Sequence, residues 1–465
     1  MDNSAFTDRD VQSVIEQLFG QDIRYIRLWF PDPLGRIKGS NISRDTIWNV
    51  FQDGSGFDGS SIEGLLRIQE SDLVARPIPR TFRKLPYLVD GQAIGNMLCQ
   101  IYTPDGRRFA GDPLWVLEKQ VAAAACLGYS TVNVGPELEF FLFKNGSPQT
   151  GKPVLVHRGG YFDEGVAHLG ATVRMRAVEA FRQLGISIEV DHGEVADSQN
   201  EIDLHYQDAL SMAHNAMLYR TVVKEVAAQL GVSASFMPKP LAGVNGSGMH
   251  IHTSLFTDGH NTFFDEQDTE YHLSATARQF MAGVFKYLPA GMIILCQWVN
   301  SFKRLVPGYE APVYLCWGRR NRSALIRVPQ YQMGKERATR IEVRCPDPAC
   351  NIPLAFAVII GMGLQGIRED LKSLPNPVED DVFRLSKTQL KKRGIASLPG
   401  SFNEALAEFR DSGLMRTILG DHLHGKICDS KEAEWRDYVA GVGKKNAPIR
   451  TKVFPWEVTY YSRWV

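Results

Sequence analysis

The stretch Gly135-Pro136-Glu137-Leu138-Glu139-Phe140-Phe141-Leu142-Phe143 determines how the rest of the chain is interpreted. The run from Val132 to Phe143 has the composition of a β-strand, in which side chains at positions i and i+2 share one face. Glu137 and Glu139 are therefore predicted to point the same way. Either they form the solvated acidic face of an edge strand, or they are buried and repel each other unless a cation lies between them. Because Phe and Leu flank both acids, we favour a metal site.

Three further segments supply polar side chains for such a site. Segment 247–252 carries two imidazoles on one face of a predicted strand, and segment 340–344 carries an acid between two guanidinium groups. Segment 194–201 has an acid at each end of a predicted loop. The resulting ligand set is rich in oxygen and has no sulfur, which suits Mg²⁺ or Mn²⁺ better than a structural Zn²⁺. Its members are Glu137, Glu139, Glu194, Glu201, His250 and Glu342.

Four arginines accompany these acids, namely Arg304, Arg322, Arg327 and Arg344. A guanidinium group is a fork-shaped donor that matches phosphate and carboxylate oxygens. Metal ions combined with arginines indicate phosphoryl transfer. A metal hydrolase could use the same carboxylates, but it would not need the four arginines.

Length and composition point to a globular protein with two domains. The 465 residues exceed one ordinary core, and 52 acidic residues balance 52 Lys and Arg. This balance predicts no nucleic-acid partner. The longest apolar stretch, Leu288 to Val299, is too short to span a bilayer, so no membrane partner is expected. Seven scattered cysteines without a Cys-x-x-Cys pair, and an acidic N-terminus unlike a signal peptide, predict a cytoplasmic protein.

The chain divides near Gly111. Residues 1–111 are predicted to form a small, mostly β unit, and residues 112–465 are predicted to alternate strands with long helices. Within the first unit, Phe57 to Gly64 reads by default as a polar, glycine-rich surface turn. The C-terminal tail from Leu374 is predicted to be helical and charged, then aromatic and extended. An apolar tail of this kind is expected to dock on another surface.

Six motifs, in the family's order, make the whole chain resemble the glutamine synthetase family, in its type I bacterial and archaeal branch. They are Phe57–Gly64, Gly135–Phe140, Asn245–His252, Asn300–Pro312, Asn321–Pro329 and Arg340–Pro348. The resemblance implies an α+β fold, with a β-grasp-like N-terminal domain and a large catalytic domain built on a curved antiparallel sheet flanked by helices. It also implies a homo-oligomer, a dodecamer of two hexameric rings whose sites are shared between subunits.

The resemblance also assigns roles to residues. Glu139, Glu194 and Glu201 match one metal site, and Glu137, His250 and Glu342 match a second that holds the nucleotide phosphates. Positions matching glutamate contacts are Asn245, Gly246, Arg304, Glu310 and Arg344. Positions matching ATP contacts are Glu189, His252, Ser254, Arg322 and Arg327. Three residues match the family's catalytic positions. They are Asp58, which would deprotonate ammonium, Glu310, which would lie on a closing flap, and Arg322.

The implied activity is ATP-dependent ligation of ammonia to the γ-carboxylate of L-glutamate through γ-glutamyl phosphate, with two or more Mg²⁺ or Mn²⁺ ions. Relatives that use an organic primary amine remain an alternative, because Gly193 stands where the family often has His and could leave space beside the amine. A non-catalytic relative is a third possibility, although such a chain should have lost metal ligands.

Overall fold

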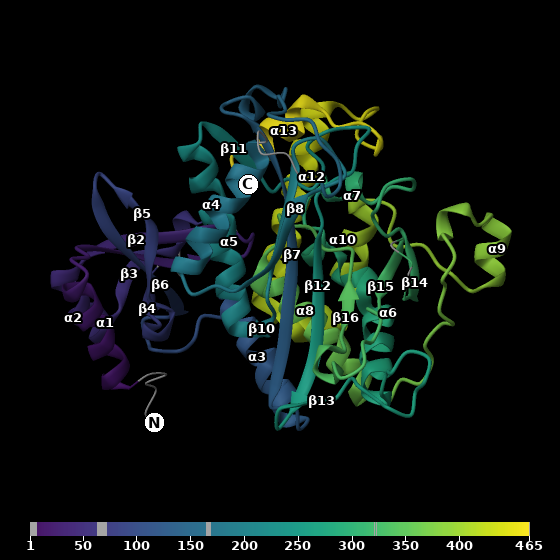
Figure 1. The fold of residues 1–465 in the computed structure, drawn as a ribbon, viewed down its shortest axis with the longest axis horizontal. Coiled ribbons are helices and arrows are strands. Elements are labelled where there is room, and N and C mark those ends of the chain that lie inside the picture. The colour runs from purple at the N-terminus through teal and green to yellow at the C-terminus, as the bar shows by residue number, and fades with distance from the viewer. Residues whose placement is uncertain (1–6, 63–71, 164–168, 320, 322, 465) are drawn as a thin grey trace.

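The computed structural model describes residues 7–62, 72–163, 169–319, 321 and 323–464 (Figure 1). In this part the N-terminal residues form a six-stranded sheet in the order β2-β1-β6-β4-β3, with β5 paired to β6. Strands β1 and β6 are parallel, and the other pairs are antiparallel. The elements are α1 (Asp8–Gly20), β1 (Tyr25–Pro31), β2 (Ile37–Ser43), α2 (Ile47–Asp53), β3 (Ser55–Asp58), β4 (Asp72–Pro77), β5 (Arg83–Val89) and β6 (Gln92–Tyr102).

Helix α1 begins with a capping box. The Thr7 hydroxyl accepts a hydrogen bond from the Asp10 backbone N–H, and the Asp10 side chain accepts one from the Thr7 backbone. Val11, Val14 and Leu18 repeat at helical spacing and are buried in a core that this helix shares with the N-terminal sheet. The N-terminal unit therefore has a core cluster of its own.

The remainder of the chain is organised on a ten-stranded sheet in the order β14-β15-β16-β12-β7-β9-β8, with three short strands attached. Only β14 and β15 pair in parallel among its described strands. The strands are β7 (Thr131–Lys144), β8 (Ile188–Gly193), β9 (Gln199–Leu204), β10 (Gln207–Asp208), β11 (Val232–Ser235), β12 (Met249–Thr257), β13 (His260–Asn261), β14 (Tyr314–Gly318), β15 (Ala324–Arg327) and β16 (Ile341–Val343).

Helices cover one face of this sheet and leave the other for the polar cluster. Figure 1 shows α4 and α5 between the two sheets, and α3, α6 and α8 against the large one. The helices are α3 (Pro113–Cys126), α4 (Leu169–Gln183), α5 (Ala209–Gln229), α6 (Ala275–Leu295), α7 (Ser301–Arg304), α8 (Ile352–Arg368), α9 (Lys387–Lys392), α10 (Phe402–Asp411), α11 (Gly413–Leu419), α12 (Asp421–Val442) and α13 (Pro455–Tyr461). None of the helices in the described ranges is both long and apolar enough to cross a membrane.

Strand β7 is central to the sheet and has two different faces. Leu138, Phe140 and Leu142 are fully buried in the main hydrophobic core, which α5 and α8 also line. Glu137 and Glu139 alternate with them, so both acids lie on the opposite face, as the strand periodicity predicted. The pairing register sets Glu137 between β12 and β9, and Glu139 opposite β9.

The hairpin between β1 and β2 docks the N-terminal sheet on the large domain. The Asn351 side chain donates to the carbonyls of Asp32 and Pro33, and Arg220 donates to the carbonyl of Gly35. Gly35 has φ +77°, and a Cβ there would lie 2.7 Å from Cα of Asn351. A side chain at this position would therefore separate the two domains.

The prediction of an extended C-terminal tail is wrong for residues 455–461, which form α13. Pro455 begins this helix, where its missing N–H costs nothing, and the Glu457 side chain accepts a 3.0 Å hydrogen bond from the Phe454 backbone. The predicted docking does occur, but on the chain's own surface: Tyr461 stacks on Trp298, with ring centroids 4.4 Å apart. Burial of its aromatic side chains favours the helix.

Candidate active site

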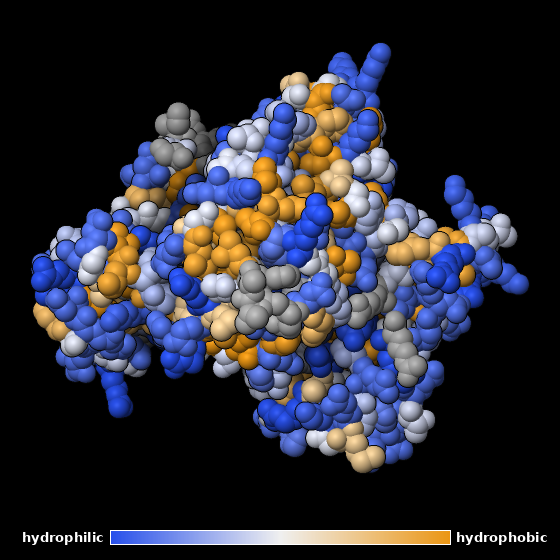
Figure 2. All heavy atoms as spheres, turned by 45° about the horizontal axis from the view of Figure 1, so that its top comes forward, coloured by the Kyte–Doolittle hydropathy of each residue, from blue (hydrophilic) through white to orange (hydrophobic). Residues whose placement is uncertain are grey.

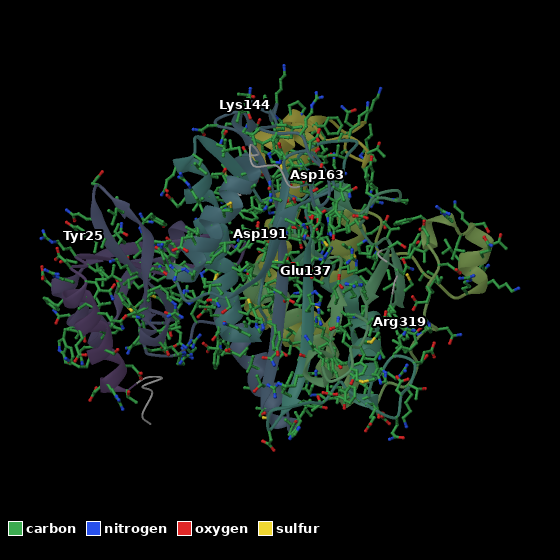
Figure 3. The ribbon with its side chains drawn as sticks, viewed as in Figure 1. Tyr25, Glu137, Lys144, Asp163, Asp191 and Arg319 are labelled. Atoms are coloured by element: carbon green, nitrogen blue, oxygen red, sulfur yellow. The ribbon has the colours of Figure 1, made fainter. Side chains whose placement is uncertain are left out.

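A cavity of about 220 Å³ opens on the polar face of the large sheet. It lies near the middle of the molecule, where Figure 3 shows Glu137 well separated from Tyr25 on the N-terminal sheet. All six predicted metal ligands line it, as do Asn245, Gly246, Glu310, Arg327 and Arg344. Residues that are up to about 200 positions apart in sequence therefore meet in one place.

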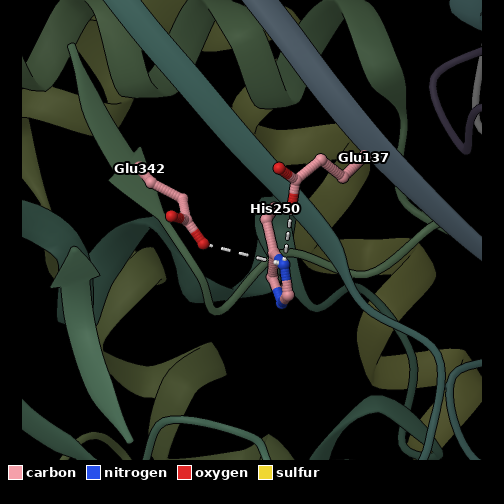
Figure 4. Close-up of side chains that lie close together, drawn as sticks. All are labelled: Glu137, His250 and Glu342. Carbon is pink, nitrogen blue, oxygen red and sulfur yellow. Dashed lines mark hydrogen bonds and ion pairs between the residues drawn. The ribbon is translucent and has the colours of Figure 1, made fainter. Parts of the chain in front are cut away.

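His250 lies between two acids (Figure 4). Its Nδ1 is 3.0 Å from Oε2 of Glu137 and 3.8 Å from Oε1 of Glu342. On the other side of the ring, Nε2 is 4.0 Å from Oε1 of Glu139 and has no hydrogen-bond partner in the described structure, although it is buried. Burial and the charge of Arg344 lower the pKa of His250 to about 4, so the ring is neutral and can act as a ligand.

A second group of possible ligands surrounds Glu201. Ligand atoms of His192, Glu201 and Asp203 all lie within 4.8 Å of one another. His192 Nδ1 is 3.6 Å from Oε1 of Glu194, and Nε2 is 3.8 Å from Oε2 of Glu201. Sequence reasoning missed His192 and Asp203. Asp203 could have been found, because it follows Glu201 by two positions on one strand.

Three carboxylates of this face, those of Glu139, Glu201 and Asp203, lack compensating charge. Burial and the charge of Glu194 raise the pKa of Glu139 to about 8, despite Arg304 nearby. Burial and the charge of Glu137 raise the pKa of Asp203 to about 8, and burial with the charge of Asp203 raises that of Glu201 well above its usual value. A divalent cation would remove this repulsion and supply the missing partner of His250. The residues present therefore fit a metal centre with oxygen and imidazole ligands.

Glu342 differs from these acids because two arginines hold it. Arg327 Nη1 donates to Oε2 over 2.7 Å, and Arg344 donates to Oε1. Burial alone would raise the pKa of Glu342, but the charge of Arg344 outweighs it and lowers that pKa to about 2. The Nε atom of Arg344 is buried and has no partner in the described structure. These arginines therefore keep donors available at the cavity wall.

Arg304 lies behind the cavity and does not line it. Its side chain is 2% exposed, and its guanidinium donates to the carbonyls of Arg344, Cys345 and Pro346. Gly248 lies where Arg304, His250 and Glu139 come together. A Cβ at this position would lie 2.5 Å from Nη2 of Arg304, 3.0 Å from Nε2 of His250 and 3.1 Å from Oε1 of Glu139. Only a glycine permits this convergence.

A second cavity, of about 270 Å³, adjoins the first, and Glu137 and Asp203 line both. Three predicted ATP contacts, Glu189, His252 and Ser254, line it. Arg340 Nε donates to Nδ1 of His252 over 3.0 Å, so the proton of His252 is on Nε2, which donates to Glu137 over 2.7 Å. The basic residues Lys335, Arg337 and Arg340 also line it. Of these, sequence reasoning had pointed only to Arg340, as one of the two guanidinium groups of segment 340–344.

Among the predicted catalytic residues that the structure describes, Asp58 is not brought to these cavities within one chain. Asp58 is exposed at the end of β3 in the N-terminal sheet, where its carboxylate accepts hydrogen bonds from Ser60, and it lines neither cavity. Arg322 lies outside the described residues. Glu310 lies at the mouth of the first cavity, 3.5 Å from Nδ2 of Asn245.

Two domain families together match most of the chain. Residues 22–104 match the model described as the glutamine synthetase β-grasp domain, and residues 110–461 match the glutamine synthetase catalytic domain. The chain belongs to the glutamine synthetase family. The predicted α+β fold, with its β-grasp N-terminal domain and large catalytic domain, is thereby confirmed.

Curated relatives agree with this membership. A glutamine synthetase of Methanosarcina mazei is 43% identical over 453 residues, which cover 97% of both chains. One of Mycolicibacterium smegmatis is 43% identical over 456 residues, covering 98% of this chain and 99% of the relative. The solved structure "GmaS/ADP complex-Conformation 1" has a TM-score of 0.83 at 26% identity, and the match covers 93% of this chain and 98% of that one. The glutamine synthetase fold therefore extends over almost the whole chain.

Proposed function

We propose that the protein ligates ammonia to the γ-carboxylate of L-glutamate with ATP, through γ-glutamyl phosphate, and releases glutamine, ADP and phosphate. Family membership and the names of the curated relatives support this activity. The observation that carries it is the cluster of acids and two imidazoles that lines the first cavity and reaches the adjoining second cavity through Glu137 and Asp203. One cavity has the size and polarity for an amino acid, and the other has basic groups for a nucleotide.

We assign the cluster to two metal ions, Mg²⁺ or Mn²⁺. Glu139, Glu194 and Glu201 would hold the first, and Glu137, His250 and Glu342 the second. When bound, such ions supply Lewis-acid stabilisation of phosphoryl oxygens. His192 and Asp203 lie close enough to Glu201 to join or orient the first ligand set.

The chain's own side chains then bind and orient the two substrates. Arg344 and Arg327 offer guanidinium donors to oxygens that gain charge during transfer of the γ-phosphoryl group. Asn245, Gly246 and Glu310 surround the place of the glutamate, and Arg304 supports it from behind. Glu189, His252 and Ser254, with Arg322, are assigned to ATP. Glu310 stands on the flap 305–311, which excludes water from the acyl phosphate.

Asp58 is assigned to the removal of a proton from ammonium, which has no lone pair until it is deprotonated. Its distance from the cavity within one chain supports a homo-oligomer in which the N-terminal domain of one subunit completes the site of the next. A dodecamer of two hexameric rings is the assembly we propose. Contacts between subunits are supported by exposed apolar side chains beside the site, those of Tyr161, Phe162 and Val195. Figure 2 also shows apolar side chains in the middle of the face that it draws.

Two further assignments follow the same family pattern. The domain boundary is placed at Gly111, with the β-grasp domain at 1–111 and the catalytic domain at 112–465. The seven cysteines are all unpaired, and six are buried, which supports a reducing, cytoplasmic setting.

Gly193 does not support the organic-amine alternative. A Cβ at Gly193 would face the carbonyl oxygen of Gly160 at 3.4 Å, and Gly193 does not line the first cavity. The space beside it is therefore already lined by the 160–163 loop.

The activity is tested by phosphate release with ATP, Mg²⁺ or Mn²⁺ and glutamate, with ammonium or a panel of primary amines as acceptor. Ammonium-dependent phosphate release with stoichiometric glutamine is expected. Turnover of an alkylamine at least about tenfold more efficient than that of ammonium would overturn the choice of acceptor.

A further inference from the structure

Lys239 is a buried lysine that neither the metal centre nor the substrate contacts use. Its side chain is 3% exposed. Its backbone N–H donates to Oδ1 of Asn300 over 2.8 Å, and Nδ2 of Asn300 donates back to its carbonyl over 2.9 Å. Asn300 directly precedes α7, the helix that ends in Arg304. The backbone of Lys239 is therefore fixed to the element that supports the site from behind.

The ammonium group of Lys239 contacts the two loops at the mouth of the first cavity. Nζ donates to the carbonyl of Val244, the residue before Asn245. Nζ also lies 3.9 Å from the ring centroid of Tyr309, the residue before Glu310. Within the described chain no carboxylate lies at ion-pair distance from Nζ, so these two contacts hold the charge.

The stem of Lys239 is packed as closely as its charged end. A Cβ at Gly246 would lie 3.2 Å from Cδ of Lys239, 3.2 Å from Cγ of Arg304 and only 2.2 Å from the carbonyl oxygen of Pro238. The loop that carries Asn245 and Gly246 therefore lies directly on the lysine side chain. One residue joins this loop, the flap 305–311 and helix α7.

We propose that Lys239 is a positioning residue that ties the flap 305–311 to the 243–247 loop and thereby keeps water from the acyl phosphate. This inference rests on the proposed ligase function and deepens it. The contact with the Tyr309 ring holds the neighbouring Glu310 over the cavity, and the contact with Val244 holds Asn245 opposite.

The reaction that the closed flap prevents is hydrolysis. The oxygen of a water molecule attacks the γ-carbonyl carbon of γ-glutamyl phosphate, and the bond from that carbon to the bridging oxygen breaks. Glutamate and inorganic phosphate leave, and the water protons pass to them and to solvent. ATP is then consumed without glutamine, so a loosened flap raises the ratio of phosphate released to glutamine formed.

The test measures phosphate and glutamine in the same reaction of the full-length protein, with saturating ATP, Mg²⁺, glutamate and ammonium. The parent should give a ratio near one. Lys239→Met should raise the ratio by about threefold or more and raise KM for glutamate more than it lowers kcat. Lys286→Met is the matched control, because Lys286 also lies over a tyrosine ring, that of Tyr287 at 4.9 Å, but on α6. Its ratio should stay near one.

A second pair of variants keeps the test open if Lys239→Met does not fold. Tyr309→Phe keeps the ring face and should retain a ratio near one, whereas Tyr309→Leu should raise it. The double variant Lys239→Met/Tyr309→Leu should give a ratio no higher than that of Lys239→Met alone, because Lys239→Met already removes the contact with the Tyr309 ring.

A ratio near one in both Lys239→Met and Tyr309→Leu would overturn the inference, as would equal ratios for Tyr309→Phe and Tyr309→Leu. Failure of the proposed function looks different, since the parent itself would then release no ammonium-dependent phosphate.

Discussion

Glu137 and Glu139 lie two positions apart on one face of β7, yet their surroundings move their pKa values in opposite directions. Burial would raise the pKa of Glu137, but His252 and His250 outweigh it and hold that pKa well below the usual value. Burial and Glu194 instead raise the pKa of Glu139 to about 8. Glu137 already has partners within the protein, whereas Glu139 lacks a cation to balance its charge.

The first prediction compares two proposed metal ligands with different partners. In the metal-free protein, Glu139→Gln should leave the free energy of unfolding unchanged or raise it by about 1 kcal/mol, because it removes repulsion with Glu194. Glu342→Gln should lower it by about 3 kcal/mol, because Arg327 and Arg344 lose their buried partner. Denaturant unfolding in EDTA measures both values.

Ligase activity supplies the second half of this comparison. Both variants should lose activity by more than about 100-fold, since each loses a metal ligand. Equal stability losses would contradict the charge assignment, and activity within a few-fold of the parent would reject the ligand assignment.

The second prediction concerns Gly248. Gly248→Ala places a methyl group within 3.1 Å of Arg304, His250 and Glu139, so it should reduce metal affinity and activity by at least about tenfold without unfolding the protein. Gly193→Ala is the control, because its Cβ meets its nearest neighbour at 3.4 Å. Metal titration and steady-state rates measure the difference. A Gly248→Ala variant as active as Gly193→Ala would show that the convergence at Gly248 is not needed.

The third prediction concerns the acceptor. Asp58→Asn should be severely impaired at pH 7 and partly recover as the pH approaches the pKa of ammonium, where free ammonia supplies its own lone pair. The pH profile of kcat/KM for total ammonium measures this. Parallel profiles for parent and variant would remove Asp58 from the proton transfer.

The fourth prediction tests whether sites are shared between subunits. Within one chain Glu139 lines the first cavity and Asp58 does not. Subunits carrying Asp58→Asn and subunits carrying Glu139→Ala should therefore each be inactive for a different reason. Mixed, dissociated and reassembled oligomers should regain a fraction of parent activity, because some sites then combine two intact halves. Unmixed samples taken through the same steps are the control. No recovery in well-mixed oligomers would place Asp58 and the metal centre of one chain in the same site.

The fifth prediction concerns pH and the domain junction. Burial raises the pKa of Asp32 from 3.8 to about 6. The contribution of Asp32 to the free energy of unfolding is fully present below pH 3.8, where its carboxyl is protonated in both states. It is lost as the pH rises through about 6, because the native state must then hold a buried charge. Asp32→Asn should therefore raise the free energy of unfolding at pH 7 by about 1–3 kcal/mol and have little effect near pH 4.

Unfolding of Asp32→Asn and parent at several pH values between 4 and 8 checks this prediction. In the parent, Oδ1 of Asp32 accepts hydrogen bonds of 2.9 Å from the backbone N–H groups of Leu34 and Arg36. The Asn side chain of the variant keeps an oxygen that can accept both. A difference between parent and variant that does not change with pH would show that Asp32 is ionised throughout.

The sequence predicted much of the fold because many of its signals are local. Thr7 and Asp10 mark the start of α1, and alternation along β7 places Glu137 and Glu139 on one face. The prediction that residues 455–461 are extended failed because Tyr461 packs on Trp298, which is distant in sequence, and this packing favours a helix. Local propensity is weak in so short a segment, so tertiary contacts decide its structure.

By itself the sequence determined which residue types could carry the chemistry, because acids, imidazoles and arginines occur in spaced motifs within apolar strands. Only the tertiary structure decided what each of them contacts. It brought His192 and Asp203 to Glu201, placed Arg304 behind the cavity, and set Lys239 between two loops. These contacts join residues far apart in the chain, and the register of β7 with β9 and β12, together with the packing of loops on that sheet, fixes them in space.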